Sequence, residues 1–393
     1  TEAGAVKLRR GSTEGVIAAS EFKNNYAVVR DGGAIVHSDG ILRIDNTKFT
    51  GNESQKGSGG AIFTDAALTV SGGSLFLGNK AADSGGAIGV ESGADITVSG
   101  ASFTENIAES GNGGAIDASS SAPLTVNDAF FSRNHADNGY GGALYASGLN
   151  TVLKNVKFDD NTALYGGGIM NFGNMTIGGG SSFTNNKASA GGAVFTLGTL
   201  NLDTTEGNIL FSGNKAEDAS EGGADIYLNT GGSTVVNIRG DANVLAMDGG
   251  FSGSGVINKT GGNTLVFGEN ADNSLFRGEF NQSAGTTLVY ADNFLGGKNT
   301  VANGSVLHFA RGARLGNLNL ERNGRLDLRS LGAFSPNTLT VEDLISDGTA
   351  VVGLQTDGTV SDLLRVTGSA TGNITLDIDA VGTNPTRQKI EVV

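Results

Sequence analysis

Two short motifs recur in step along the chain, and this repetition restricts its possible folds more than any other feature. The first, Phe-x-x-Asn, has eight copies spaced by 25 to 28 residues. Its copies are Phe22/Asn25, Phe49/Asn52, Phe76/Asn79, Phe103/Asn106, Phe131/Asn134, Phe158/Asn161, Phe183/Asn186 and Phe211/Asn214. The second is Gly-Gly-Ala plus an aliphatic residue, with its second glycine at Gly33, Gly60, Gly86, Gly114, Gly142 and Gly192 and variants at Gly167 and Gly223. A fixed period of this length indicates a stacked repeat array.

Each repeat contains three strand-like segments. A third element, apolar-Thr-apolar, lies between the two motifs, as at Leu68–Val70, Ile96–Val98 and Leu124–Val126. Strands this short cannot bury an apolar face alone, so equivalent strands must stack above and below them at about 4.8 Å. The sequence therefore predicts an all-β fold, a right-handed three-sided parallel β-helix of roughly fifteen turns. The glycine pairs and the missing 3.6-residue period exclude helical repeats.

The repeated residues have structural interpretations. We expect the eight phenylalanines to form one internal ladder, each buried ring contributing about 1.5–3 kcal/mol. The asparagines lie where the chain turns, and their amides can bond along the stack. The glycine pairs suit tight corners that need positive φ.

The chain divides into three parts by pattern. Residues 1–235 carry the two motifs, and residues 236–337 continue with divergent strand-sized segments such as Thr264–Phe267 and Val306–Phe309. Residues 338–393 form a separate C-terminal part that ends in a last expected strand, Lys389–Val393.

Composition excludes several functional classes. The chain has no cysteine, so thiolate zinc sites and cysteine nucleophiles are absent. Its formal charge of −14 argues against nonspecific nucleic-acid binding. No stretch is apolar enough for a membrane-spanning helix, and Thr1 to Arg10 does not resemble a signal peptide. Calcium-binding nonapeptide and phosphate-binding loop motifs are missing, so we expect no metal and no cofactor.

The paired motifs carry a family resemblance. Gly-Gly-Ala-Ile with Phe-x-x-Asn resembles the repeats of the polymorphic membrane proteins, which are autotransporter adhesins. The segment Ser361–Val366, with Gly368 and Gly372, resembles the autochaperone cap that closes autotransporter passenger domains. The resemblance implies a passenger exported across the Gram-negative outer membrane to the cell surface. Membrane contact would then require a translocator barrel, which is absent from this chain.

The same resemblance suggests partners. Similarity to one adhesin of this family implies binding to host extracellular-matrix components, including glycosaminoglycans and fibronectin. Two alternatives stay open: a carbohydrate-active β-helix enzyme, a lyase or hydrolase, and a self-associating protein that aggregates cells. An enzyme would need paired carboxylates, for which Asp128 with Asp159, Asp159 with Asp160, or Asp203 with Glu206 are candidates. We expect a non-enzymatic protein, because each of these lies where a solvated acid is ordinary.

Two charged surfaces are candidate binding sites. Residues 298 to 329 carry six basic side chains against Glu321 and Asp327, a local charge of +4. These are Lys298, Arg311, Arg314, Arg322, Arg325 and Arg329. Arginines suit sulfated glycans, because guanidinium groups bind such anions bidentately, although pairing with neighbouring carboxylates is the alternative. A weaker hypothesis is an acidic protein-binding face formed by Asp45, Asp95, Asp128 and Asp159.

Overall fold

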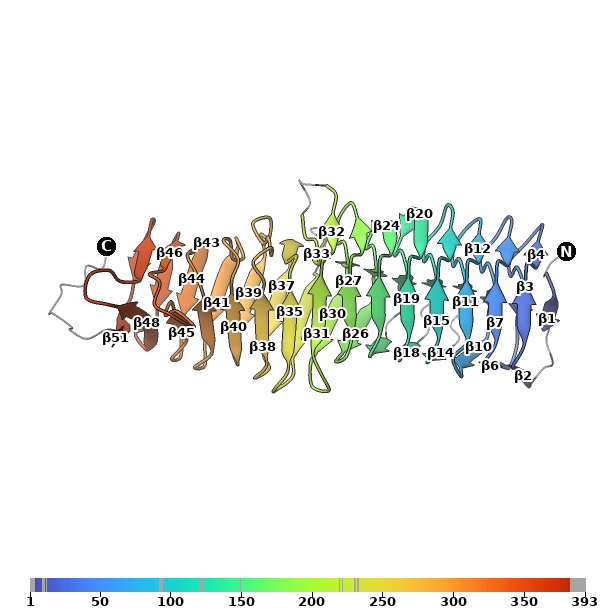
Figure 1. Ribbon diagram of the computed structural model, residues 1–393, viewed down its shortest axis with the longest axis horizontal. Coiled ribbons are helices and arrows are strands. Elements are labelled where there is room, and N and C mark those ends of the chain that lie inside the picture. Colours follow the sequence, from blue (N-terminus) through green and yellow to red (C-terminus); the bar gives the residue numbers. More distant parts are fainter. Residues whose placement is uncertain are drawn as a thin grey trace.

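The protein is an elongated stack of parallel strands (Figure 1). The computed structural model describes residues 4–8, 11, 13–91, 95–119, 123–148, 150–218, 220, 222–229, 231 and 233–381, and these contain strands and turns but no helix. The expected strand Lys389–Val393 lies outside the described residues. The predicted all-β parallel solenoid is confirmed. Within the described residues no helix is long and apolar enough to cross a membrane.

Five sheets, here called A to E, run along the stack. Sheet A has ten strands: β1 (Val6–Leu8), β5 (Ile35–His37), β9 (Ile62–Thr64), β13 (Ile88–Val90), β17 (Ile116–Ala118), β21 (Leu144–Ala146), β25 (Ile169–Asn171), β29 (Val194–Thr196), β33 (Ile226–Leu228) and β36 (Phe251–Gly253). Sheet B has 15 strands: β2 (Glu14–Ala18), β6 (Ile41–Asp45), β10 (Ala67–Ser71), β14 (Ile96–Ser99), β18 (Leu124–Asn127), β22 (Thr151–Lys154), β26 (Asn174–Gly178), β30 (Thr199–Asp203), β34 (Val235–Arg239), β37 (Val256–Lys259), β39 (Glu279–Gln282), β41 (Lys298–Val301), β44 (Asn317–Leu320), β47 (Leu344–Ser346) and β50 (Ala370–Thr371).

Sheet C also has 15 strands: β3 (Glu21–Lys23), β7 (Lys48–Thr50), β11 (Leu75–Leu77), β15 (Ser102–Thr104), β19 (Phe130–Ser132), β23 (Lys157–Asp159), β27 (Ser182–Thr184), β31 (Ile209–Ser212), β35 (Val244–Met247), β38 (Thr264–Phe267), β40 (Thr286–Val289), β42 (Val306–Phe309), β45 (Arg325–Asp327), β48 (Ala350–Thr356) and β51 (Ile374–Ala380). Sheet D has eight short strands: β4 (Tyr26–Ala27), β8 (Glu53–Ser54), β12 (Lys80–Ala81), β16 (Ile107–Ala108), β20 (His135–Tyr140), β24 (Thr162–Tyr165), β28 (Lys187–Ala188) and β32 (Lys215–Ala216). Sheet E has three: β43 (Ala313–Leu315), β46 (Thr338–Val341) and β49 (Leu363–Val366).

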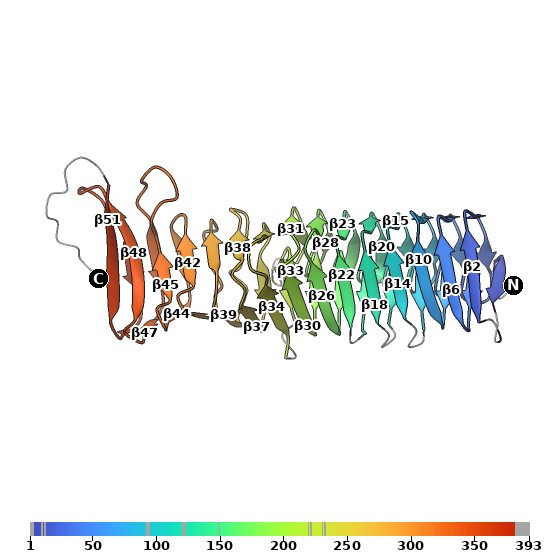
Figure 2. The ribbon, with the colours of Figure 1, turned by 90° about the horizontal axis from the view of Figure 1, so that it is seen from below.

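Each turn of the N-terminal part passes through sheets B, C, D and A in that order. Sheet D is an addition to the three predicted strands, because at least two extended residues follow each asparagine turn and direct a small side chain such as Ala81 or Ala108 inward. Sheets A and D end near β36 and β32, whereas B and C run on to β50 and β51 (Figure 2). Beyond the end of sheet A, isolated bridges from Gly253 to Phe276 and from Asn293 to Arg314 continue the third side of the solenoid. Sheet E then forms this side.

The predicted phenylalanine ladder is present in sheet C. Neighbouring rings from Phe22 to Phe211 lie 4.7–5.0 Å apart and within 5–6° of parallel. Parallel pairing in register places Phe76 beside Phe49 and Phe103, so the repeat period itself sets the stacking. Beyond the ladder, Phe267, Phe294 and Phe309 pack edge to face instead, because the motif no longer recurs.

The asparagine ladder is structural, as predicted. In the middle of the stack, Asn106 donates through Nδ2 to the carbonyl of Phe76 and to Oδ1 of Asn134, at 3.0 and 2.9 Å. The backbone N–H of Asn106 donates to the same Oδ1 atom at 3.0 Å. Each amide thus bonds to the turn before it and to the turn after it, which is why these buried polar side chains cost little.

Asp225 ends the asparagine ladder, which the sequence alone did not indicate. The last asparagine, Asn214, donates to Oδ1 of Asp225 at 2.9 Å, and Oδ2 accepts the N–H groups of Gly249 and Gly250. The carboxyl is fully buried, and burial raises its pKa to about 6. The inserted acid in Gly-Gly-Ala-Asp-Ile therefore connects the regular repeats to the divergent turns.

The two glycines of each corner have different roles. The first has a positive φ, for example 67° at Gly85 and 65° at Gly113, as predicted. At the second, a Cβ atom would lie about 2.1 Å from a carbonyl oxygen of the next turn, as at Gly86 beside Gly114. The second glycine therefore permits the close approach of successive turns.

Candidate functional site

The six basic residues predicted as a glycan site do not form one row. Lys298 begins β41 in sheet B, Arg325 begins β45 in sheet C, and Arg314 is the middle residue of β43 in sheet E. Arg311, Arg322 and Arg329 lie in the connections between strands. The structure therefore distributes a group that is compact in sequence over several sides of the solenoid.

Three of the five arginines are engaged in ion pairs with described residues. Arg325 and Arg329 both bind Asp327, at 3.1 and 2.7 Å, and Asp377 accepts from both at 2.7 and 3.4 Å. Burial would raise the pKa of Asp327, but hydrogen bonds from Arg329 and Arg325 hold it below its usual value. Arg311 pairs with Asp292 at 3.1 Å. The alternative interpretation, pairing with neighbouring carboxylates, thus describes Arg325 and Arg329, and a glycan-binding role for the group stays a prediction.

Sheet E presents a pair of arginines that the sequence did not connect. Arg314 pairs in register with Thr340, and Thr340 with Arg365, so the two arginines lie two strands apart on the outer face. Both are exposed, and neither forms an ion pair with a described residue. Arg314 also borders a surface hollow of about 350 Å³, whose lining includes Asn293 and Thr338. Arg365 was missed because it lies far from Arg314 in sequence, and only strand pairing reveals their proximity.

The four acidic residues of the predicted protein-binding face lie at different edges. Asp45 and Asp128 are at the turn from sheet B to sheet C, Asp95 precedes β14, and Asp159 ends β23. Asp128 accepts a hydrogen bond from Asn155 at 2.7 Å, and Asp159 accepts one from Thr184 at 2.7 Å. They do not share one face, and a binding role for them is a prediction.

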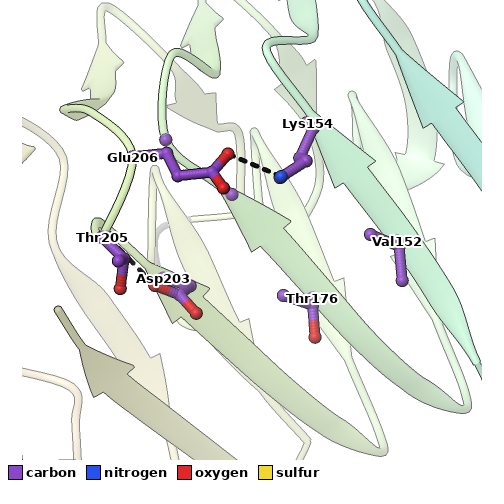
Figure 3. A pocket seen from close by; sticks show the side chains of 8 residues that line it. Val152, Lys154, Thr176, Asp203, Thr205 and Glu206 are labelled. Atoms are coloured by element: carbon purple, nitrogen blue, oxygen red, sulfur yellow. Dashed lines mark hydrogen bonds and ion pairs between the residues drawn. The ribbon is translucent and has the colours of Figure 1, made fainter.

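A hollow on sheet B contains one of the carboxylate pairs considered for catalysis (Figure 3). It measures about 230 Å³ and is lined partly by Val152, Thr176 and Thr205. Lys154 extends toward Glu206 and pairs with it at 2.5 Å, while Asp203 pairs with Arg239 at 3.0 Å. Each of the two carboxylates thus forms an ion pair with its own basic side chain. Burial would raise the pKa of Asp203, but hydrogen bonds from Thr205 and the charge of Arg239 hold it below its usual value.

Two buried charged groups are structural features that the sequence did not indicate. Lys259 is 0% exposed, and its Nζ atom donates to the carbonyls of Gly261, Asn263 and Ala284 at 2.7–3.1 Å. Burial lowers the pKa of Lys259 to about 8. Asp117, on the outer face of β17, is 6% exposed. In the described part of the chain, no three His, Cys, Asp or Glu side chains form a group that could hold a metal ion.

Comparison with known proteins connects the chain to autotransporters. The Chlamydia polymorphic membrane protein repeat matches residues 46–65, 73–91 and 180–197. The chain is 37% identical over 111 residues to Autotransporter CRAC of Citrobacter rodentium, which covers 27% of this chain and 7% of that protein. It is 26% identical over 216 residues to the Autotransporter adhesin/invasin TibA of Escherichia coli O78:H11, covering 47% of this chain and 21% of TibA. The chain thus spans less than a quarter of the length of either curated relative.

These matches agree with the architecture. The repeat family, the autotransporter relatives and the parallel β-solenoid fit a passenger domain that is exported across the outer membrane and exposed at the cell surface.

Proposed function

We propose that this chain, an autotransporter passenger domain by its repeats, its solenoid and its relatives, is a surface adhesin that binds host surfaces. The alignment with an adhesin/invasin over 47% of the chain is the observation that carries the proposal. The long exposed sheets support it, since a row of weak contacts along a rigid rod gains strength from multivalency. Both relatives are named as autotransporters or adhesins, which favours a non-enzymatic role.

Binding of the purified chain to cultured host cells and to an array of matrix proteins and glycans tests this function. We expect saturable binding to cells and to at least one array component. An absence of both contradicts the adhesin proposal. Sedimentation of the free chain at increasing concentration distinguishes the alternative, self-association, which would produce larger species without any host ligand.

We further propose that sulfated glycosaminoglycans bind at the outer face of sheet E. Arg314 and Arg365 flank Thr340 at a spacing of two strands, about 10 Å, and both guanidinium groups are free of carboxylates among the described residues. Guanidinium groups bind sulfates with charge-assisted, often bidentate hydrogen bonds. Arg325 and Arg329 contribute less in this proposal, because Asp327 and Asp377 already neutralise them.

Heparin binding at two salt concentrations tests the glycan site. The variant Arg314→Glu with Arg365→Glu should bind heparin about tenfold or more weakly than wild type, and wild-type affinity should fall steeply with salt. The matched control, Arg43→Glu with Arg133→Glu, changes net charge equally at exposed arginines near the other end. Equal loss in both variants would indicate a nonspecific charge effect, and no loss in the first would place the glycan site elsewhere.

Fibronectin is a second proposed ligand, by resemblance to matrix-binding adhesins of this kind. Because Asp45, Asp95, Asp128 and Asp159 lie at separate edges, we propose that they would contribute separate weak contacts. Changing all four to asparagine and measuring fibronectin capture tests this, and unchanged capture would remove these residues from the interface.

A further inference from the structure

An acidic hollow lies on the outer face of sheet A near the N-terminal end of the stack. It measures about 190 Å³, and four carboxylates line it. Asp31 and Asp83 come from the connections that lead into β5 and β13, Glu91 directly follows β13, and Asp117 is the middle residue of β17. Successive turns of the solenoid thus bring together acids that are far apart in sequence.

Asp117 is the deepest of the four. The strand register places it between Gly89 and Tyr145 on the outer face of the sheet. Gly89 has no side chain, and a Cβ atom there would meet the backbone N of Gly59 at 2.8 Å, so the corner of the preceding turn packs directly against Gly89, next to Asp117. The Asp117 side chain is 6% exposed, and its Oδ1 atom has no hydrogen-bond partner within the described residues. A buried carboxylate oxygen without a partner is costly, and Asp117 is one of the residues that line the hollow.

The surrounding charges increase this cost. Burial raises the pKa of Asp117 to about 7, with Asp83 adding repulsion and the Ser84 and Ser119 hydroxyls opposing the shift. Burial and repulsion from Asp65 and Asp31 likewise raise the pKa of Glu91.

The carboxylates that line the hollow form no ion pair with a described residue. His37 acts on Asp65, but burial lowers the pKa of His37, so its ring is neutral near pH 7. A cation entering the hollow would therefore gain from several carboxylates that have no positive partner in the described part of the chain.

The shape of the hollow favours an organic cation over a metal ion. Its carboxylates are not among any group of three ligands close enough to hold a metal among the described residues. Phe63, which pairs in register with Gly89 on the outer face, supplies an apolar wall beside the acids. An aliphatic stem can pack against such a wall while its charged end reaches the carboxylates, and an aromatic ring adds cation–π attraction.

We propose that this hollow binds a lysine or arginine side chain of a partner protein, with the ammonium or guanidinium group at Asp117 and the aliphatic stem against Phe63. The site is separate from the arginines of sheet E and selects ligands of opposite charge. An experiment can therefore disprove the proposal for one site without disproving the proposal for the other.

A labelled oligo-arginine peptide, compared with a peptide in which citrulline replaces every arginine, tests the proposal. Wild type should bind the arginine peptide and discriminate against the neutral one. Asp117→Asn keeps the shape of the side chain and should weaken binding about tenfold or more, because it removes the buried charge. The matched control Asp241→Asn removes one charge at an exposed turn outside the hollow and should change affinity less than about twofold.

Folding and metal binding are controlled separately. Thermal melting should show Asp117→Asn to be at least as stable as wild type, because a buried charge without a partner is lost. If that variant does not fold, Glu91→Gln at the exposed rim should still weaken peptide binding. Equal affinity of wild type and all three variants for the arginine peptide would overturn the proposal. It would also be overturned if calcium ions bound wild type but none of the variants and displaced the peptide.

Discussion

Replacing Phe131 with alanine should lower the free energy of unfolding by about 3–5 kcal/mol. Phe131 is 0% exposed and lies in the middle of the phenylalanine ladder. The rings of Phe103 and Phe158 are 4.8 and 4.9 Å away, nearly parallel to it on either side. Its removal therefore leaves a gap between two rings.

The gap should not close, and this places the expected cost toward the upper end of the range. Strand pairing on both sides and the asparagine bonds of Asn134 fix the spacing of successive turns, so Phe103 and Phe158 cannot approach each other. Phe22, by contrast, has a ring neighbour on one side only and is partly buried. Phe22→Ala should cost about 1.5–3 kcal/mol, the value of lost burial without an enclosed cavity.

Denaturant unfolding followed by far-ultraviolet circular dichroism measures both effects. Tyrosine fluorescence gives a second probe, since the chain has six tyrosines and no tryptophan. Two probes are needed because stacked repeats can unfold in parts, and coincident transitions would justify a single free energy. Phe131→Leu is the control and should cost less than Phe131→Ala. An unchanged midpoint for Phe131→Ala, or an equal cost at Phe22, would refute the rigid-ladder argument.

Three further outcomes are expected. The raised pKa of Asp225 favours the folded state below about pH 4, and this contribution is lost as pH rises through about 6. The difference in unfolding free energy between wild type and Asp225→Asn should therefore shift by up to about 3 kcal/mol across that window. A pH-independent difference in denaturation experiments would contradict this expectation. Asn134→Ala leaves the carbonyl of Phe103 and the amide of Asn106 without their partners, so denaturant titration should show a loss of at least about 1–3 kcal/mol, and a neutral result would contradict the ladder's role. Deleting residues 338–393 exposes strand edges of the last turns, so light scattering after dilution from denaturant should show aggregation or slow refolding; clean refolding at the full-length rate would remove the autochaperone assignment.

The regular part of the fold could be predicted because each repeat specifies its own position. A phenylalanine or asparagine that recurs at a constant step in a parallel stack must face its equivalents, and slipping by one residue would turn Phe131 outward. The glycine corners follow from the same register. Sheet D was not predicted, because two-residue strands carry no alternation that could be detected.

The candidate sites were less predictable, because their residues do not repeat. Arg311 and Arg314 are three residues apart but differ in partners, since one faces Asp292 and the other lies on sheet E. Arg365 reaches Arg314 only through strand pairing. Asp117 is in a copy of the Gly-Gly-Ala-Ile strand, where nothing marks it as deeply buried.

The sequence by itself determined the solenoid, its ladders and its corners, because identical side chains at a fixed period can be buried only by stacking. The tertiary structure decided which charged groups are neighbours. Turn lengths in the divergent region set the sheet on which each arginine lies, and strand pairing places Asp117 between Gly89 and Tyr145. Burial, repulsion and partner distances depend on neighbouring turns in space, and these are quantities that a periodic pattern along the chain does not contain.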